Sequence, residues 1–494
     1  MEKNTGKNIW YTSINTIILS ATGFIFWIIV AKITNIETIG LTTAINSLVL
    51  IIVVIDVMDT SFGMKRYLGI SISRGDTDEF KQILTAAVIL VSIMITISAI
   101  IITLPQLRIL EGFGIDREYV WIILAIIVAT VFQRIFSEAL IAGHSSKNLI
   151  MPTVLASIIR FPLLLIAVYI FNELNYGVIL AYSLPLFVTA VMYFIYSAKI
   201  FQNKQQKTKN IIMYIKIVFR AGLASWIPHT IEVLGSQLAI LSVFAIGGAA
   251  SGGKFYMPMA IFTLALVVVN GVNRVSHPLV GSMTQTKQTD HLSHVLKLSF
   301  LVTIPIIIPL MYFSDNFLSL VGNEFRTASN TLTILMCCVP FAIISEIVYY
   351  FIYGKGDHKT LLYLGLVGNL PRVVLYFLLV PELNSDGGAI AYLVGTVTQF
   401  SLTVIIAFKQ NLKLNYHKYA IITGIPFIIG SVMWLLNFNY LFSTGIIFVT
   451  SLISYIKLRL FTNVELKNIL FSSLPTNIAE KLYIILSKVI NKID

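Results

Sequence analysis

The sequence has 494 residues, of which 57% are hydrophobic and only 12% are charged, and its mean hydropathy is +0.85. A water-soluble domain carries about twice that share of charged residues. Composition therefore excludes a soluble protein and predicts one that is embedded in lipid. The net charge of +12 needs no nucleic-acid partner, because most of it falls in loops that would face anionic membrane lipids.

Fourteen apolar stretches in the sequence have the length, about 20 residues, that crosses a bilayer as a helix. The first follows Lys3 and Lys7, but it is long and no small-residue cleavage site follows it, so we interpret it as a retained span. Continuous Ile, Leu and Val runs favour helices over a β-barrel. In chain order the stretches cover residues 9–31, 39–58, 82–104, 119–141, 150–171, 177–198, 217–246, 254–280, 292–313, 329–353, 359–380, 387–408, 417–436 and 440–461.

The basic residues predict the orientation of these spans. With the N-terminus in the cytoplasm, 25 of the 35 Lys and Arg residues fall on the cytoplasmic side, five fall outside and five lie within spans. Cytoplasmic loops carry an excess of Lys and Arg. The sequence therefore predicts a multi-pass protein of the cell membrane with an even number of spans and both termini in the cytoplasm.

A repeated phrase divides the chain. ELNYGVILAY covers Glu173–Tyr182, and ELNSDGGAIAY covers Glu382–Tyr392. Each copy follows a Gly/Lys turn and an apolar span with a central arginine beside a proline. The copies fall on spans 5–6 and 11–12, which predicts two six-span lobes related by an axis along the membrane normal. Such lobes commonly rock around a central site, so the repeat favours transport by alternating access.

The predicted all-α membrane fold thus has about 14 transmembrane helices in two six-helix lobes, with two extra helices at the end. The tail has apolar residues at helical spacing, which predicts an amphipathic helix on the cytoplasmic leaflet or against the protein. The predicted parts are an N-lobe at 1–198, a basic linker at 199–216, a C-lobe at 217–410, the extra helices at 411–462 and the tail at 463–494.

Arg160 and Arg372 are the central arginines of the two repeats. A charged side chain at mid-membrane costs at least about 2.5–3.5 kcal/mol. We expect both to face a central cavity, where a guanidinium offers a planar fork of donors to phosphate. The neighbouring proline removes a helix hydrogen bond in each span, which predicts kinks and free carbonyl groups at Ile158 and Val367. Pairing with a neighbouring helix, or snorkelling, is the alternative.

Three further arginines lie within the predicted spans. Arg134 precedes Glu138 by four residues, a spacing that favours an ion pair within one helix, with substrate binding as the alternative. Arg220 lies near the cytoplasmic end of its span, where snorkelling is the simpler reading. Arg274 lies in the polar segment NGVNRVSHP, which indicates either a cavity wall or a cytoplasmic gate.

The acidic residues of the spans have two candidate roles. Glu232, Glu346 and Asp56 are the main candidates, and with Asp59 and Glu138 the five intramembrane acids match five arginines. This match favours charge balance, while binding of a coupling ion, H⁺ or Na⁺, is the alternative. Asp56 and Asp59 lie near a cytoplasmic helix end, where exposure to water would also explain them.

No signature of catalysis or of a cofactor stands out in the sequence. It contains no phosphate loop, nucleophile elbow or zinc motif, and its two cysteines, Cys337 and Cys338, are adjacent, which suits neither a disulfide framework nor a metal cage. The sequence therefore predicts neither an enzyme nor a protein that binds a metal or a cofactor.

Two six-span lobes, a basic linker, two extra spans, the opening segment Ser13–Asn46 and the two repeat blocks resemble the multidrug/oligosaccharidyl-lipid/polysaccharide (MOP) exporter superfamily. The repeat-unit (Wzx-type) polysaccharide flippase branch is the most similar. The resemblance implies a monomer with two lobes in a V around a cationic lumen, which moves an oligosaccharide linked to polyprenyl phosphate or pyrophosphate from the cytoplasmic to the outer leaflet. The rival is a MATE-like cation-coupled multidrug antiporter, with an acidic or aromatic lumen.

The related lipid II flippases also rely on arginines in spans 1 and 2, according to the same resemblance. This chain has none there, and only Lys32 comes near. Arg274 is then the best remaining match to the cavity arginines of that group.

Overall fold

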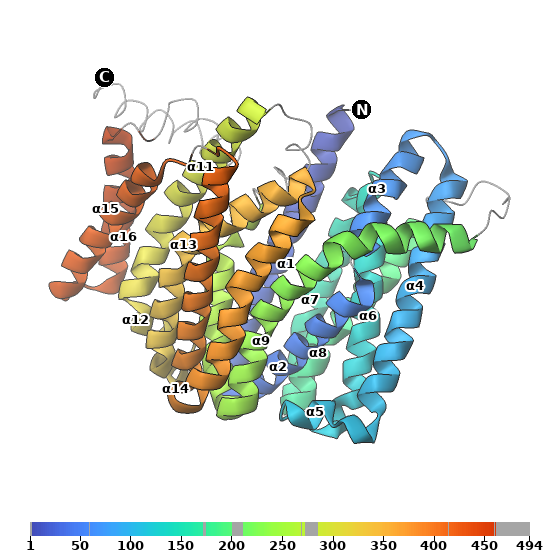
Figure 1. Ribbon diagram of the computed structural model, residues 1–494. Helices are drawn as coiled ribbons and strands as arrows, with labels where there is room; N and C mark the ends of the chain where they lie inside the picture. Colours follow the sequence, from blue (N-terminus) through green and yellow to red (C-terminus); the bar gives the residue numbers. More distant parts are fainter. Residues whose placement is uncertain are drawn as a thin grey trace.

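The computed structural model describes residues 2–58, 60–170, 174–199, 211–267, 269–271, 285–412, 414–458 and 460. All regular structure in these residues is helical (Figure 1). The first helices are α1 (Glu2–Ile33), α2 (Ile36–Val57), α3 (Thr60–Ser73), α4 (Thr77–Thr103), α5 (Ile109–Gly112), α6 (Val120–Ala142), α7 (Lys147–Tyr169) and α8 (Leu174–Lys199). The second set is α9 (Ile211–Ala265), α11 (Gln285–Tyr312), α12 (Ser314–Val321), α13 (Ser329–Lys355), α14 (His358–Lys409), α15 (Tyr416–Leu435) and α16 (Tyr440–Lys457).

Twelve helices of the described chain are long and apolar enough to cross a membrane, and two of these, α9 and α14, are hairpins. The first turns at Gly248, with φ 82°, and the second at Asn384, with φ 50°. Glycine adopts positive φ freely and asparagine tolerates it better than most residues. The arms of α14 run side by side, since a Cβ on Gly387 would lie 2.4 Å from the carbonyl oxygen of Leu379. With each hairpin crossing twice, the predicted fold of about fourteen spans is confirmed.

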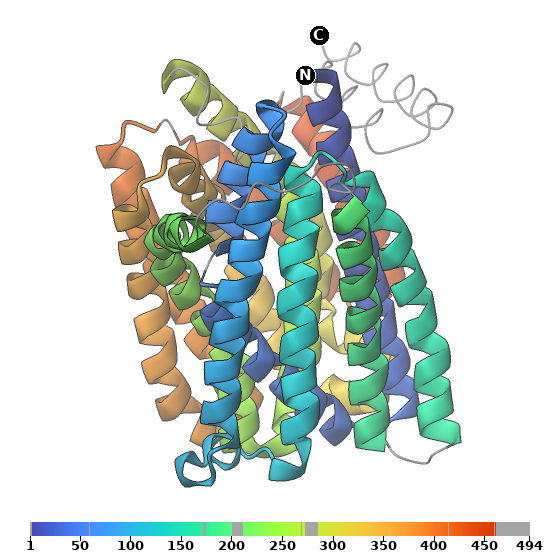
Figure 2. The ribbon, with the colours of Figure 1, turned by 90° about the vertical axis from the view of Figure 1, so that its right-hand side faces the viewer.

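The helices form two lobes, and α9 joins them. The N-lobe (α1–α8) and the C-lobe (from the second arm of α9 to α14) are blue to teal and yellow to orange in Figure 1, with α15 and α16 at the far edge. The first arm of α9 starts across the N-lobe, and it is seen almost end-on in Figure 2. Its Tyr214 and Val218 are buried in the N-lobe core, and Trp226 Nε1 donates to Val54 O at 3.1 Å.

The prolines beside the two repeat arginines do not break their helices. α7 continues through Pro162 and α14 through Pro371. In the second repeat the carbonyl at Val367, predicted to be free, accepts a hydrogen bond from Thr398 Oγ1 at 3.0 Å. A hydroxyl from the facing helix arm therefore supplies the bond that proline removes. Among the described residues of α9 and α14, the non-helical breaks lie at the hairpin turns instead.

One face of the molecule carries α5, α12 and the turn within α14, opposite the N-terminus (Figure 1). The end of α1 reaches this face, where α1 contacts α12. We call it the α12 face and the opposite one the N-terminal face; in the predicted orientation the α12 face is outside. The predicted amphipathic tail, residues 463–494, lies outside the described residues, as does most of the predicted linker.

Candidate functional site

Arg160 lies on α7 among aromatic rings. Its guanidinium carbon is 5.2 Å from the ring centroid of Phe26 and 5.2 Å from that of Tyr182. Tyr256 is within Coulombic range of the same guanidinium. Trp27 completes the group, because its ring centroid lies 5.7 Å from that of Tyr182 and 4.9 Å from that of Tyr256. We call these four aromatic residues the aromatic box.

The aromatic box spans both lobes. Phe26 and Trp27 come from α1 and Tyr182 from α8, whereas Tyr256 comes from the second arm of α9. The Trp27–Tyr256 contact therefore joins the N-lobe to the C-lobe directly beside Arg160. A motion that separates the lobes there must break this contact.

The buried positive charge of Arg160 has few stabilising partners. The residue is only 8% exposed, and among the described residues it has neither a hydrogen-bond acceptor nor an ion-pair partner, while its Nε is buried without a partner. Cation–π contacts at a desolvated site contribute about 2 kcal/mol, which is less than the cost of burying an unpaired charge. The site is thus chemically suited to an incoming anion that can accept two parallel hydrogen bonds.

Arg372, the repeat mate, is held by fixed partners. Its Nη1 donates to Asn369 Oδ1 at 2.8 Å and its Nη2 donates to Thr396 Oγ1 at 3.0 Å. Its guanidinium carbon lies 4.2 Å from the ring centroid of Tyr392, and the residue is 3% exposed. The bond to Thr396 joins the two arms of the α14 hairpin, whereas the bond to Asn369 lies within the first arm.

The two arginines share one arrangement that explains the sequence repeat. Arg160 lies over Tyr182 and Arg372 lies over Tyr392. These tyrosines are the Ala-Tyr residues that end the two ELN phrases. The sequence repeat therefore encodes an arginine and its stacking partner, one pair in each lobe. The tyrosines were visible as repeated letters, but nothing in a single sequence assigned them to the arginines.

A second pair of contacts follows the same symmetry at the α12 face. A Cβ on Gly40 would lie 1.9 Å from Ala249 O, and one on Gly253 would lie 2.2 Å from Ile36 O. Ile36 and Ala249 have the same sequence separation as Gly40 and Gly253, so each contact is the image of the other. Such a self-complementary contact surrounds a twofold axis. We call these four residues the glycine seal.

The asparagines of the ELN phrases flank the glycine seal. Asn175 Oδ1 accepts a hydrogen bond from Thr38 Oγ1 at 2.7 Å, and Asn384 Oδ1 accepts one from Ser251 Oγ at 3.5 Å. Thr38 and Ser251 each lie two residues before a seal glycine. The start of α2 and the start of the second arm of α9 are thus in backbone contact, and the lobes are closed at the α12 face.

Asp56 lies in the N-lobe and is not exposed to water. It is 0% exposed, Ser98 Oγ donates to its Oδ1, and its Oδ2 is buried without a partner. The expectation that water explains Asp56 is therefore wrong, because α4, which carries Ser98, packs against α2 at this point. Asp59 lies outside the described residues.

Glu232 and Glu346 gather near Arg372. Glu232 lies on the first arm of α9 and Glu346 on α13, and the three charged groups are within Coulombic range of one another. Each carboxylate keeps a buried Oε2 without a hydrogen-bond partner. This geometry suits charge balance, and it leaves carboxylate oxygens for a cation. In the described chain no group of three or more His, Cys, Asp or Glu residues could hold a metal ion.

The other predicted arginines are spread over the fold. Arg134 and Glu138 lie one turn apart on α6, half-buried, and both have interaction partners. Arg220 is exposed near the start of α9, which agrees with a snorkelling side chain. Arg274 lies outside the described residues.

Comparisons with known proteins agree with this architecture. A family model described as MatE matches residues 223–378. A probable multidrug resistance protein of Bacillus subtilis, YoeA, is 22% identical over 230 residues, which cover 43% of this chain and 49% of that protein. The chain therefore spans about half the length of this curated relative.

Two solved structures are similar over most of the chain. The lipid II flippase MurJ, in an inward closed conformation, has a TM-score of 0.68 at 16% identity, covering 91% of this chain and 99% of its own. An inward-facing multidrug resistance MATE family transporter has a TM-score of 0.65 at 15% identity, covering 81% and 98%. The fold is therefore the one that these two transporters share, the fold of the MOP superfamily. They come from two branches, a lipid flippase and a multidrug transporter.

Proposed function

We propose that this protein moves an oligosaccharide linked to polyprenyl phosphate or pyrophosphate from the leaflet at the N-terminal face to the leaflet at the α12 face. The observation that carries the proposal is Arg160, a buried cation at the junction of the lobes that has only rings as partners among the described residues. A phosphate or pyrophosphate linker is the part of such a lipid that would pair with it. The sugars would pass between the lobes while the apolar tail stays in lipid.

In this proposal the aromatic box holds Arg160 between transport events. When the lobes part at the N-terminal face, Trp27 and Tyr256 separate, and a phosphate replaces the rings as the partner of the guanidinium. Hydrogen bonds to a charged group contribute about 1.5–3 kcal/mol each, so the anion competes with the cation–π contacts. Opening of the glycine seal then exposes the linker to the other side. The lobes thus alternate between closure at the glycine seal and closure at the Trp27–Tyr256 contact, with Arg160 between them.

Arg372 has a different role in the proposal. Because Asn369 and Thr396 accept hydrogen bonds from its two terminal nitrogens, Arg372 braces α14 and positions Tyr392. Glu232 and Glu346 balance its charge or take up a coupling H⁺ or Na⁺. Asp56, with one unpaired buried oxygen, is a second candidate for a coupling proton. We propose no substrate contact for Arg372 in the closed state.

A cation-coupled multidrug transporter is the second candidate function. Two observations favour it: the aromatic box beside the lobe junction, and the unpaired oxygens of Glu232 and Glu346. Against it, a cationic drug in the aromatic box would meet the charge of Arg160 at close range.

Substitution of Arg160 separates the two candidates. Arg160→Ala is expected to slow export of the lipid-linked glycan at least tenfold, because one charge-assisted pair is lost, and the glycan accumulates at the cytoplasmic leaflet. Arg160→Lys keeps the charge without the planar fork and is expected to export at an intermediate rate. Arg220→Ala is the matched control, since Arg220 is exposed. Normal export by Arg160→Ala, with altered drug resistance, would favour the multidrug transporter instead.

A further inference from the structure

A cavity of about 670 Å³ opens on the α12 face, away from Arg160. It lies between the end of α11, α12 and the start of α13 on one side and the α15–α16 hairpin on the other. Its volume falls in the range of small-ligand pockets, about 300–1,000 Å³. Neither the aromatic box nor the glycine seal contributes to its wall.

Five aromatic residues line the cavity: Tyr312, Phe313, Trp434, Phe438 and Tyr440. Trp434 is 54% exposed and Phe438 is 43% exposed, so their rings are open to a ligand. The two tyrosines are fixed in place. Tyr312 OH is hydrogen-bonded to Ser431 Oγ, and the ring of Tyr440 lies 5.8 Å from that of Phe317. The wall therefore offers broad apolar faces that are already in position.

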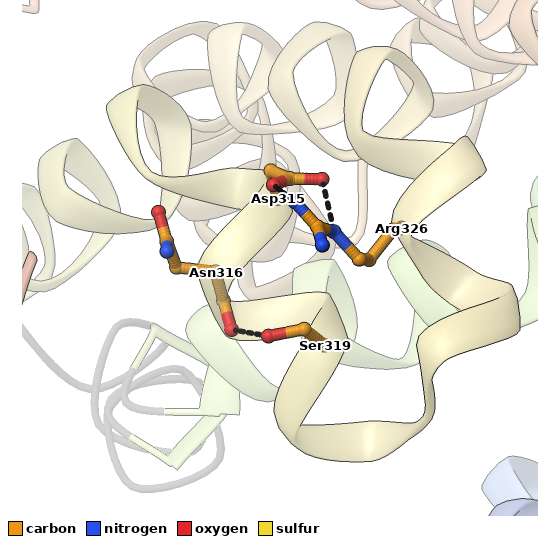
Figure 3. Close-up of polar contacts among 4 residues, drawn as sticks. All are labelled: Asp315, Asn316, Ser319 and Arg326. Atoms are coloured by element: carbon orange, nitrogen blue, oxygen red, sulfur yellow. Dashed lines mark hydrogen bonds and ion pairs between the residues drawn. The ribbon is translucent and has the colours of Figure 1, made fainter.

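Carboxamides lie between these rings. Asn316, Asn330 and Asn437 line the cavity, and none of the three side-chain amides has a hydrogen-bond partner within the described chain. Each amide can donate two hydrogen bonds and accept two. In Figure 3 the amide of Asn316 points away from the neighbouring ion pair.

That ion pair, Asp315 with Arg326, neutralises the one carboxylate of the cavity wall. Arg326 Nε donates to Asp315 Oδ1 at 3.1 Å and Arg326 Nη2 donates to Oδ2 at 2.6 Å (Figure 3). This bidentate ion pair links α12 to the segment before α13. The cavity is thus lined by rings and neutral amides on a braced frame, without a free charge among its described lining residues.

We infer that this cavity binds the sugar rings of a short oligosaccharide. A pyranose ring has an apolar C–H face that packs on an aromatic ring and a rim of hydroxyl groups that both donate and accept hydrogen bonds. Flat aromatic surfaces interleaved with amides match both features. An aliphatic lipid chain would leave the three amides unpaired, and a phosphate would find no free cation, because Arg326 is occupied by Asp315.

The sugar has two possible sources: the head of the transported lipid after it crosses, or a free glycan outside the cell. Sugar binding itself follows from the cavity alone. Its assignment to the transported head rests on the proposed function.

Fluorescence of Trp434 tests the inference on the full chain in lipid nanodiscs. The signal is the difference between the wild type and Trp434→Phe. The probes are the oligosaccharide released by mild acid from the cell's own lipid-linked pool, the intact lipid-linked form, sugar-free polyprenyl phosphate, and a panel of neutral di- to tetrasaccharides. We expect saturable quenching by a sugar probe and about tenfold weaker binding in Asn316→Ala and Asn437→Ala. Leu435→Ala is the matched control, because Leu435 is 68% exposed and lies outside the cavity wall.

Quenching by a sugar probe that the asparagine variants weaken supports the inference. In that case, tighter binding of the intact lipid-linked form assigns the sugar to the transported head, and equal binding of the released oligosaccharide assigns it to a free glycan. Quenching by sugar-free polyprenyl phosphate alone, no saturable quenching by any probe, or quenching that the asparagine variants leave unchanged would each overturn it. Normal export by Arg160→Ala would refute the proposed function and leave this binding intact.

Discussion

Arg160 and Arg372 show how one motif gives two environments. Three residues before Arg372 stands Asn369, and four after Tyr392 stands Thr396; both accept hydrogen bonds from Arg372. The corresponding N-lobe positions carry Ser157 and Leu186. Ser157 is shorter and is hydrogen-bonded to Thr22, and leucine accepts no hydrogen bond. The N-lobe arginine therefore lacks the two acceptors that hold its mate.

Restoring those acceptors should immobilise Arg160. In a Ser157→Asn/Leu186→Thr double variant, the guanidinium gains two local partners, and an incoming anion must displace them. We expect export of the lipid-linked glycan to fall about tenfold or more at unchanged protein level, since each hydrogen bond to a charged group contributes about 1.5–3 kcal/mol. Leu184→Thr, at an exposed position on the same helix, serves as the control. Unchanged export in the double variant would count against Arg160 as the anion site.

The reverse change in the C-lobe should affect stability. Asn369→Ser/Thr396→Leu leaves a buried guanidinium without its two acceptors, and each unmade bond costs about 1–3 kcal/mol. The apparent Tm of the purified protein in detergent should fall by several degrees, whereas binding of a phosphate-linked lipid to Arg160 should be retained. A variant that keeps the wild-type Tm would argue against a bracing role for Arg372.

The pH dependence of the α12 cavity follows from Asp315. The hydrogen bonds from Arg326 lower the pKa of this carboxyl below its ordinary value. A carboxyl with a lowered pKa contributes stability above its unfolded pKa, about 3.9, and that contribution is lost as pH falls through the folded value. Sugar binding followed by Trp434 fluorescence should therefore be constant from pH 8 to 5 and decline only below about pH 4. Asp315→Asn should bind weakly at pH 7, and a transition near pH 6 in the wild type would contradict this assignment.

At the scale of elements, the glycine seal is a close crossing between α2 and α9. The backbones approach so closely at Gly40 and Gly253 that no Cβ fits against the facing carbonyl oxygens. Glycine is needed here for space, since neither residue is among those with positive φ. Any larger residue must push the lobes apart at the α12 face.

Alanine in the seal should therefore favour opening at the α12 face. Gly40→Ala and Gly253→Ala are each expected to shift spin labels at positions 37 and 254 to longer distances, measured by pulsed electron paramagnetic resonance with the native cysteines replaced. Gly23→Ala is the control, because a Cβ on Gly23 has no neighbour within 4 Å. Distances that stay unchanged in both seal variants would show that the close crossing of α2 and α9 does not control how tightly the lobes close at the α12 face.

Much of this arrangement could be predicted from sequence, and the limits have physical reasons. The spans follow from hydropathy and the pairing of Arg160 with Arg372 follows from the repeat, because both signals lie in the order of residues along the chain. The aromatic box, the seal and the acceptors of Arg372 depend on which helix faces meet, which a single sequence does not contain. For the same reason the sequence alone does not show that Asp56, which lies near a helix end, is shielded from water by α4; its role in charge balance or ion coupling stays a prediction.

At the scale of the whole molecule, the two lobes meet at two levels near their common axis. The glycine seal joins them at the α12 face, and the Trp27–Tyr256 contact joins them beside Arg160. Alternating access requires that these contacts open in turn, never together. In the proposed transport cycle, the first arm of α9, which packs on the N-lobe before the chain enters the C-lobe, couples the lobes during this motion.

The decisive measurement is the accessibility of position 160 to a reagent from each side of the membrane. In a variant with Arg160→Cys and the native cysteines replaced, a small anionic, membrane-impermeant thiol reagent is applied from each face in turn. We predict modification from the N-terminal face and, when Gly40→Ala opens the seal, from the α12 face as well. A thiol at position 160 that reacts from neither face under any condition would contradict it.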